Sequence, residues 1–376
     1  MIAETVAESP AEHARTRLRR RVLFVAGFDP RGVKGYYQRM SEAMAPYAAA
    51  GSLERLAPFA SGWRWRGEDG ATETAFEFLH WDDIVDRHWR AKGRIGAQIA
   101  AMRALWVYAR CGLLARASDG ARAVRWALLV MGLAPLAFAA ATLVFTLVVG
   151  ALGAWLIPHG GWLAAPTLAA GLYMSDRAWR ALNLEWLAKG FACIVETALG
   201  EAPSWDGRCE VFAERIAAAA REGEADEIVV IGHSLGAILA MFSVHRYLGS
   251  TASPRPIVLA TLGNIIPFYT WIEPGRAAMR AGEAVAASPA VEWIDVTSGS
   301  DPASACRMGP LVGAEVATRR WDPEFHRILT PERFRYIRRR PLDFHFQYLK
   351  GADAPDGFDL PRLMASPAPF FAEAPQ

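Results

Sequence analysis

The longest hydrophobic pattern in the chain spans residues 126–175, fifty positions that contain no Asp, Glu, Lys or Arg. One helix that crosses a membrane needs ~20 apolar residues, so this block has the length of two such helices and a turn. We expect the turn at 157–161, where a proline and two glycines interrupt regular structure, with 150–153 as the alternative place. The pattern therefore predicts a helical membrane hairpin over residues 118–180.

Outside this block, short apolar runs alternate with amphipathic stretches. Runs of four to eight apolar residues bounded by turn residues are typical of buried strands, whereas apolar residues three and four positions apart are typical of helices. The strand-like runs lie at 22–27, 227–231, 256–263 and 291–298, and a hairpin-like pair lies at 61–67 and 72–81. Strands and helices that alternate in this way predict an α/β fold, in which a mostly parallel sheet carries helices on both faces.

The apolar hairpin interrupts what we interpret as one folded body. The first part of the body is expected at 20–117 and the second part at 181–351. Residues 1–19 lack the apolar stretch of a secretory signal. They are expected to form a disordered basic leader. The Pro/Ala-rich residues 352–376 are expected to form a flexible tail.

Both parts of the body must lie on the same side of a membrane, so the hairpin either crosses twice or re-enters from one side. The other interpretation is a pair of core helices in a soluble protein, but such helices are usually shorter and carry some polar residues. Basic residues near membrane ends favour the cytoplasmic side. They flank the block at both ends: Arg110, Arg116, Arg122, Arg125, Arg177, Arg180 and Lys189. We therefore expect an inner or cytoplasmic membrane protein whose body faces the cytoplasm.

Composition narrows the classes of function. The 376 residues are 52% hydrophobic and 21% charged, and the net charge of +2 argues against a nucleic-acid partner. The four cysteines have no CxxC spacing, so neither a metal site nor a disulfide framework is expected. The chain has no H-E-x-x-H, Walker A or G-x-G-x-x-G motif, and we expect no metal or nucleotide cofactor.

Residues 227–248 place a serine between an apolar strand and an apolar helix. The strand EIVVI is followed by Gly232-His233-Ser234-Leu235-Gly236 and then by AILAMFSVHRYL. In the pattern G-x-S-x-G, a sharp turn exposes the serine hydroxyl, and the two glycines keep that turn free of side chains. The start of the helix adds amide N–H groups and a positive dipole end beside the serine. We therefore expect Ser234 to be a nucleophile.

This segment resembles the elbow of lipases and esterases in the α/β-hydrolase superfamily. Outside the elbow, the resemblance rests on the order of the elements. It implies an α/β-hydrolase-type fold in which the acid and then the base of a triad follow Ser234 along the chain. By this resemblance the acid is Asp301, in the loop SGSDPAS, and the base is His345, in DFHFQYL.

Alternatives exist for both partners. Asp295, inside the strand-like run at 291–298, is the alternative acid, and His326 is the alternative base. Tyr348 fills the place of a tyrosine that often lies near the superfamily's histidine. His233 is expected to pack against the site or to line it.

The resemblance also implies two donors to an oxyanion. One is the backbone N–H of Leu235, and the other comes from the loop after an early strand. The segment VAGFDPRG places the N–H of Phe28 in that loop. The sequence has Ala26 where the superfamily usually has a histidine.

Together these features predict a membrane-anchored serine hydrolase that cleaves carboxylic esters, with lipid-like acyl esters as substrates, through an acyl-enzyme. The expected partners are the ester or lipid substrate and membrane lipids. Acyl transfer to another alcohol would use the same three residues. A membrane-anchored, hydrolase-like scaffold without turnover is the alternative from another class.

Overall fold

The computed structural model describes residues 18–47, 54–57, 59–66, 72–116, 122–272, 276–305, 308–311 and 318–372. Within them, eight strands form one sheet in the order β2-β3-β4-β1-β5-β6-β7-β8. The strands are β1 (Leu18–Val25), β2 (Glu54–Ala57), β3 (Ala60–Arg66), β4 (Thr72–Leu79), β5 (Glu227–His233), β6 (Ile257–Leu262), β7 (Val291–Val296) and β8 (Thr318–Trp321). Strand β3 is antiparallel to both neighbours, and the other pairs of neighbours are parallel.

Strands β1 and β5 lie side by side at the centre of the sheet. Their parallel register pairs Val22 with Val229 and Val25 with Gly232. Because parallel strands end at the same edge of a sheet, the loop after β1 leaves beside the turn after β5. This register brings the VAGFDPRG segment next to Ser234.

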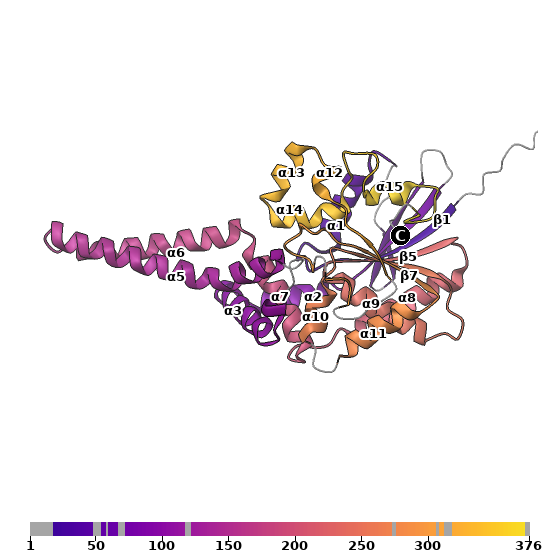
Figure 1. Ribbon diagram of the computed structural model, residues 1–376, viewed down its shortest axis with the longest axis horizontal. Coiled ribbons are helices and arrows are strands. Elements are labelled where there is room, and N and C mark those ends of the chain that lie inside the picture. The colour runs from indigo at the N-terminus through magenta and orange to yellow at the C-terminus, as the bar shows by residue number, and fades with distance from the viewer. Residues whose placement is uncertain are drawn as a thin grey trace, which may run out of the picture.

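Helices cover both faces of the sheet (Figure 1). One face carries α1 (Gly32–Met44), α12 (Phe325–Ile328), α13 (Pro331–Arg338), α14 (Pro341–His345), η3 (Phe346–Leu349) and α15 (Leu360–Ala365). The other face carries α2 (Asp82–Ala91), α7 (Leu184–Ala198), α8 (Asp206–Glu222), α9 (Gly236–Gly249), α10 (Ile266–Ile272) and α11 (Ala277–Ala287).

The central strands alternate between two hydrophobic cores. Val22 and Phe24 pack under one layer of helices, whereas Leu23 and Val25 pack under the other. Successive side chains of a strand point to opposite faces, so a strand buried on both faces is apolar at every position. The predicted α/β fold, with a mostly parallel sheet and helices on both faces, is confirmed.

The apolar block forms a helical pair that projects from the body (Figure 1). Helix α5 (Arg122–Leu156) is followed by the turn η2 (Gly160–Leu163) and by α6 (Ala164–Ala181), which packs back along α5. The chain therefore reverses just after Leu156, in the predicted stretch 157–161, and the alternative 150–153 lies inside α5. Helix α3 (Arg94–Arg110), continued by α4 (Leu113–Arg116), packs along α5 and α7 and joins the pair to the body.

The surface of this pair is apolar. Within the described residues, α5 is the one helix long and apolar enough to cross a membrane, over the 32 residues Arg125–Leu156, and only 28% of its apolar window is buried. A core helix would be mostly covered by other elements. The exposed side chains of α5 include Leu133, Leu136, Leu143, Val144, Phe145, Leu147, Val148 and Leu152.

The expectation of a flexible tail over 352–376 is wrong for residues 352–372. Helix α15 and the segment after it pack on the body, where Phe370 and Phe371 are buried. The guanidinium of Arg20 donates to the carbonyls of four residues there, namely Leu363, Met364, Ser366 and Ala368. The Pro/Ala-rich composition of the segment gave no indication of these buried rings and hydrogen bonds. Residues 373–376, and residues 1–17 of the predicted leader, lie outside the described part, while Leu18 and Arg19 belong to β1.

Candidate active site

Ser234 occupies the sharp turn between β5 and α9. Its backbone has φ = 56°, in the left-handed region that costs a non-glycine residue about 1–3 kcal/mol. The turn is held by the N–H of Ser234, which donates to the Leu262 carbonyl at 2.9 Å. A Cβ on Gly236 would lie 2.5 Å from the Ala26 carbonyl oxygen, so a larger residue would push α9 away from the end of β1. Strain held in place by such close packing is typical of functional sites.

Asp301 and His345 form a buried pair. The Nδ1 of His345 lies 2.7 Å from Oδ2 of Asp301, and both side chains are fully buried. Asp301 also accepts hydrogen bonds from the Tyr348 hydroxyl at 3.1 Å and from the Ala303 N–H at 2.9 Å. Because an ionised carboxylate only accepts, Nδ1 of His345 must carry the proton, which leaves the lone pair on Nε2.

Tyr348 holds the carboxylate in place. Its hydroxyl accepts from the N–H of Ser298 at 2.8 Å and donates to Asp301. Burial, followed by the nearby Asp301 charge, raises the pKa of Tyr348 well above its ordinary value. The phenol therefore stays protonated and remains a donor at neutral pH.

His345 lies directly against the serine turn. Its ring is 4.9 Å from the ring of His233, and the two residues are joined by a 3.2 Å hydrogen bond between Nε2 of His233 and the carbonyl of His345. The Nε2 atom of His345 is buried and has no hydrogen-bond partner among the described residues. No hydrogen bond therefore joins Nε2 of His345 to the Ser234 hydroxyl in the described residues, and such bonds are often long or poorly aligned in unliganded catalytic sites.

Phe28 and Leu235 flank Ser234 in a small apolar pocket. The pocket is lined by these three residues together with Trp186, Leu187, Phe191, Ile265 and Ala303. A Cβ on Gly27 would lie 2.9 Å from Cβ of Ser234, so the loop after β1 approaches the nucleophile closely. Within the described part of the chain, the N–H groups of Phe28 and Leu235 donate to no protein acceptor.

Two indoles fix the loop that carries Phe28. Trp81 donates from Nε1 to the Ala26 carbonyl at 2.8 Å, and Trp186 donates to the Phe28 carbonyl at 2.7 Å. With both carbonyls held, the Phe28 N–H has a defined direction, which a preorganised oxyanion donor requires.

Tyr36, which no sequence pattern singled out, connects the loop after β1 to the serine turn. Its hydroxyl accepts from the Gly27 N–H at 2.9 Å and lies 3.0 Å from Nδ1 of His233. Burial, and then the proximity of His345, lowers the pKa of His233 well below its ordinary value, so its ring is neutral. The bonds are satisfied if Tyr36 donates to Nδ1 and Nε2 of His233 donates to the carbonyl of His345. A tyrosine in α1 carries no motif, so only the fold could reveal this link.

The two alternative residues lie elsewhere. Asp295 is buried in β7, where Oδ1 accepts from the hydroxyls of Thr261 at 2.6 Å and Thr297 at 3.2 Å. His326 is exposed on α12 and its ring contacts Phe334. Within the described residues, the structure therefore pairs Asp301 with His345 and gives neither alternative a place beside Ser234.

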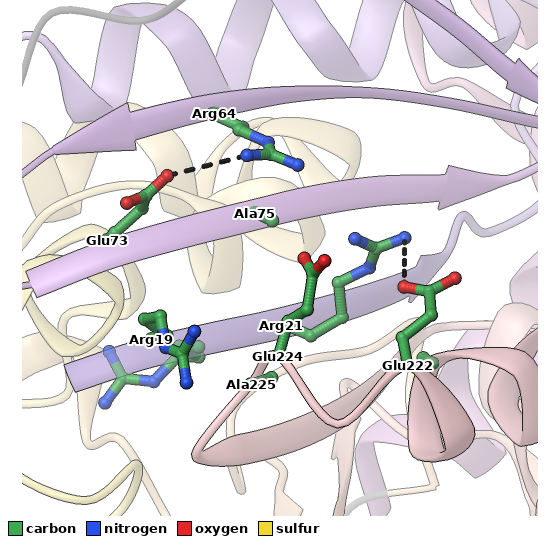
Figure 2. A pocket seen from close by; sticks show the side chains of 10 residues that line it. Arg19, Arg21, Arg64, Glu73, Ala75, Glu222, Glu224 and Ala225 are labelled. Carbon is green, nitrogen blue, oxygen red and sulfur yellow. Dashed lines mark ion pairs between the residues drawn. The ribbon is translucent and has the colours of Figure 1, made fainter.

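A second pocket lies at the opposite end of β1 and is polar (Figure 2). Its arginines face carboxylates: Arg64 is 3.7 Å from Glu73, and Arg21 is 3.9 Å from Glu222. Arg19 lies 3.9 Å from Asp226. Because these charges are matched, the pocket is a surface ion-pair network at the amino ends of the strands, away from Ser234.

No group of three or more His, Cys, Asp or Glu residues suited to a metal ion occurs in the described ranges. Comparisons of the chain with protein-family models, with curated proteins and with solved structures found no match.

Proposed function

We propose that the protein is a membrane-anchored serine hydrolase of the α/β-hydrolase type that cleaves carboxylic esters through an acyl-enzyme. The observation that carries the proposal is the fully buried Asp301–His345 pair beside a serine with φ = 56°. A buried imidazole whose Nδ1 is held by a carboxylate, with Nε2 free, has the form of a general base. A scaffold without turnover would have no use for this costly arrangement.

In the proposed reaction, the Ser234 hydroxyl attacks the ester carbonyl and its proton passes to Nε2 of His345. The negative charge of Asp301 stabilises the imidazolium and keeps the ring in the correct tautomer. When the tetrahedral intermediate collapses, the bond to the alcohol breaks and the imidazolium returns the proton to the leaving oxygen. Water then repeats both steps on the acyl-serine and releases the acid.

The oxyanion would be bound by the N–H groups of Phe28 and Leu235. Both residues line the pocket of Ser234, and these N–H groups have no protein acceptor within the described residues. Each such donor typically contributes about 3 kcal/mol to stabilising the transition state. The apolar lining from Trp186 and Ile265 excludes water and strengthens these interactions.

Membrane anchoring is proposed from the projecting α5–α6 pair. Its surface side chains are large and apolar over most of its length, and an exposed apolar surface of this extent marks a membrane or protein contact. The absence of charge over 126–175 favours lipid as the partner.

An activity-based probe tests the proposal. We expect a fluorophosphonate to label the detergent-solubilised protein at Ser234 and to lose this labelling in Ser234→Ala. Asp301→Asn should slow labelling by roughly 10³-fold or more, because the imidazole loses its correct tautomer. Ser243→Ala is the matched control, since Ser243 is buried in α9 and donates to Leu239. The proposal would be refuted if Ser234→Ala were labelled as strongly as the natural protein. It would also be refuted if the folded natural protein were not labelled at all.

A further inference from the structure

An apolar groove lies where the α5–α6 pair meets the body. Trp126, Ala127 and Val130 of α5 form one wall, and Trp186 and Leu187 of α7 form another. Pro302 and Ala303, which directly follow Asp301, close it on the side of the sheet. The groove has no charged side chain among its lining residues, so it is suited to a hydrocarbon rather than to a polar ligand.

This groove adjoins the pocket of Ser234. Trp186, Leu187 and Ala303 line both spaces. Trp186 is half-buried between them, and its indole is oriented by the hydrogen bond to the Phe28 carbonyl. Trp186, Leu187 and Ala303 therefore stand between the groove and the space at Ser234.

The groove also continues outward along the helical pair. Trp126 and Val130 are both groove walls and exposed residues, at 61% and 47% exposure. Leu133 and Leu136, one and two turns further along α5, are likewise exposed. Exposed apolar side chains of α5 thus lead to the groove, and the groove lies next to the pocket of Ser234.

We propose that this groove binds the acyl chain of a long-chain ester. The ester leaves the membrane along α5 and presents its carbonyl to Ser234. The proposal rests on the proposed function and adds the substrate class. A flexible, unbranched hydrocarbon matches the apolar lining of the groove and its lack of charge. Each methylene buried in the groove should improve kcat/KM by up to about fourfold, until the chain fills it.

The test fills the groove without touching the catalytic residues. Ala127→Trp places an indole inside the groove, while Ala140→Trp is the matched control at an exposed position of the same helix. We expect the ratio of kcat/KM for p-nitrophenyl palmitate to that for p-nitrophenyl butyrate to fall at least tenfold in Ala127→Trp. The ratio should stay within twofold of the natural value in Ala140→Trp. An unchanged ratio in Ala127→Trp would overturn the groove proposal while leaving ester hydrolysis intact.

A binding measurement separates the two proposals. Ser234→Ala protein is irradiated with a diazirine-bearing palmitate ester, and the labelled peptides are mapped. Labelling of the segment around 126–130 and of the segment around 184–187, reduced in the Ala127→Trp background, supports the groove even if no ester is hydrolysed. Labelling confined to the outer parts of α5 and α6 would refute it.

Discussion

Two buried aspartates lie near the carboxyl ends of the strands, and their partners give them different properties. Asp301 is paired with the imidazole of His345, whereas Asp295 accepts hydrogen bonds from the hydroxyls of Thr261 and Thr297. Burial raises the pKa of Asp295 to about 6, and these hydroxyls offset only part of that effect. In the unfolded chain the same group has a pKa near 3.8. The folded protein therefore holds the proton more tightly than the unfolded protein does.

This difference predicts how Asp295 affects stability as pH changes. Well below pH 3.8 the carboxyl is protonated in both states and has no effect on stability. As the pH rises from about 4 to about 6, the unfolded chain releases the proton before the folded protein does, and the unfolding free energy falls by about 3 kcal/mol. An asparagine at this position would accept the same hydroxyl bonds without a charge. We expect Asp295→Asn to gain about 3 kcal/mol in unfolding free energy relative to the natural protein between pH 4 and pH 7.

Urea denaturation of both proteins at four pH values between 4 and 7 measures this difference. Effects of all other groups cancel, because both proteins contain them. A difference that stays constant over this range would show that Asp295 is not buried as a proton-binding group. Fluorophosphonate labelling should remain in Asp295→Asn, in contrast to Asp301→Asn.

The candidate site shows which residues a sequence can reveal. Ser234 lies in a motif whose spacing follows from the turn itself, and the resemblance to α/β-hydrolases implied Asp301 and His345 through the order of a triad along the chain. The distance of 2.7 Å between Nδ1 of His345 and Oδ2 of Asp301 depends on packing of η3 and the loop 298–304, which no local pattern encodes. Tyr36 was missed because its contacts to Gly27 and His233 exist only once α1 covers the sheet.

At the scale of elements, the C-terminal segment packs on the body, although its Pro/Ala-rich composition predicts a flexible tail. Arg20 of β1 is almost fully buried and bonds to four carbonyls of the segment 363–368 and to Glu227 of β5. The ring of Phe370 packs against its guanidinium, with 5.0 Å between the guanidinium carbon and the ring centroid. A buried guanidinium needs such partners, so this segment is part of the core and not an appendage. Prolines and alanines made the segment look unstructured, because the few anchoring aromatics are widely spaced.

Phe371 provides a direct test of this conclusion. Its side chain is fully buried and stacks on Phe358, so truncation would leave a cavity. We expect Phe371→Ala to lower the unfolding free energy by about 3–5 kcal/mol, as measured by urea denaturation. Tyr336→Ala, which removes an exposed ring on α13, is the control and should change it by less than about 1 kcal/mol. Equal stability of Phe371→Ala and the natural protein would restore the interpretation of a loose tail.

At the scale of the whole molecule, the dimensions of the α5–α6 pair bear on the proposed membrane anchoring. Thr142 of α5 contacts Ser175 of α6, with 3.2 Å between their hydroxyl oxygens. Asp176 follows at once and is paired with Arg94 and Arg180. From Thr142 to the end of α5, the charge-free paired section has about 15 residues and a length of ~22 Å. A bilayer has a hydrocarbon core of ~30 Å, so this section is too short to cross it.

These dimensions favour the re-entrant arrangement over two full crossings. Placing the pair deeper would bring Asp176, Arg180 and Arg94 into hydrocarbon, at a cost of several kcal/mol. We therefore expect the tip around His159 to end inside the membrane, while the ion pairs of Asp176 stay at the headgroup layer. In a crossing arrangement the tip, with exposed Trp155 and Trp162, would instead emerge at the opposite headgroup layer.

Labelling of a cysteine at the tip distinguishes the two arrangements. In a background that lacks Cys111 and Cys306, His159→Cys is reconstituted into vesicles and treated with a membrane-impermeant maleimide from either side. We expect labelling only after detergent is added, since a re-entrant tip is out of reach from both sides. Arg103→Cys on α3 is the matched control, because its side chain is exposed on the body and should react from one side in intact vesicles. If the tip thiol of His159→Cys reacted from the side opposite to the control thiol, two crossings would be established. The bilayer would then have to become thinner around the pair to match its length of ~22 Å.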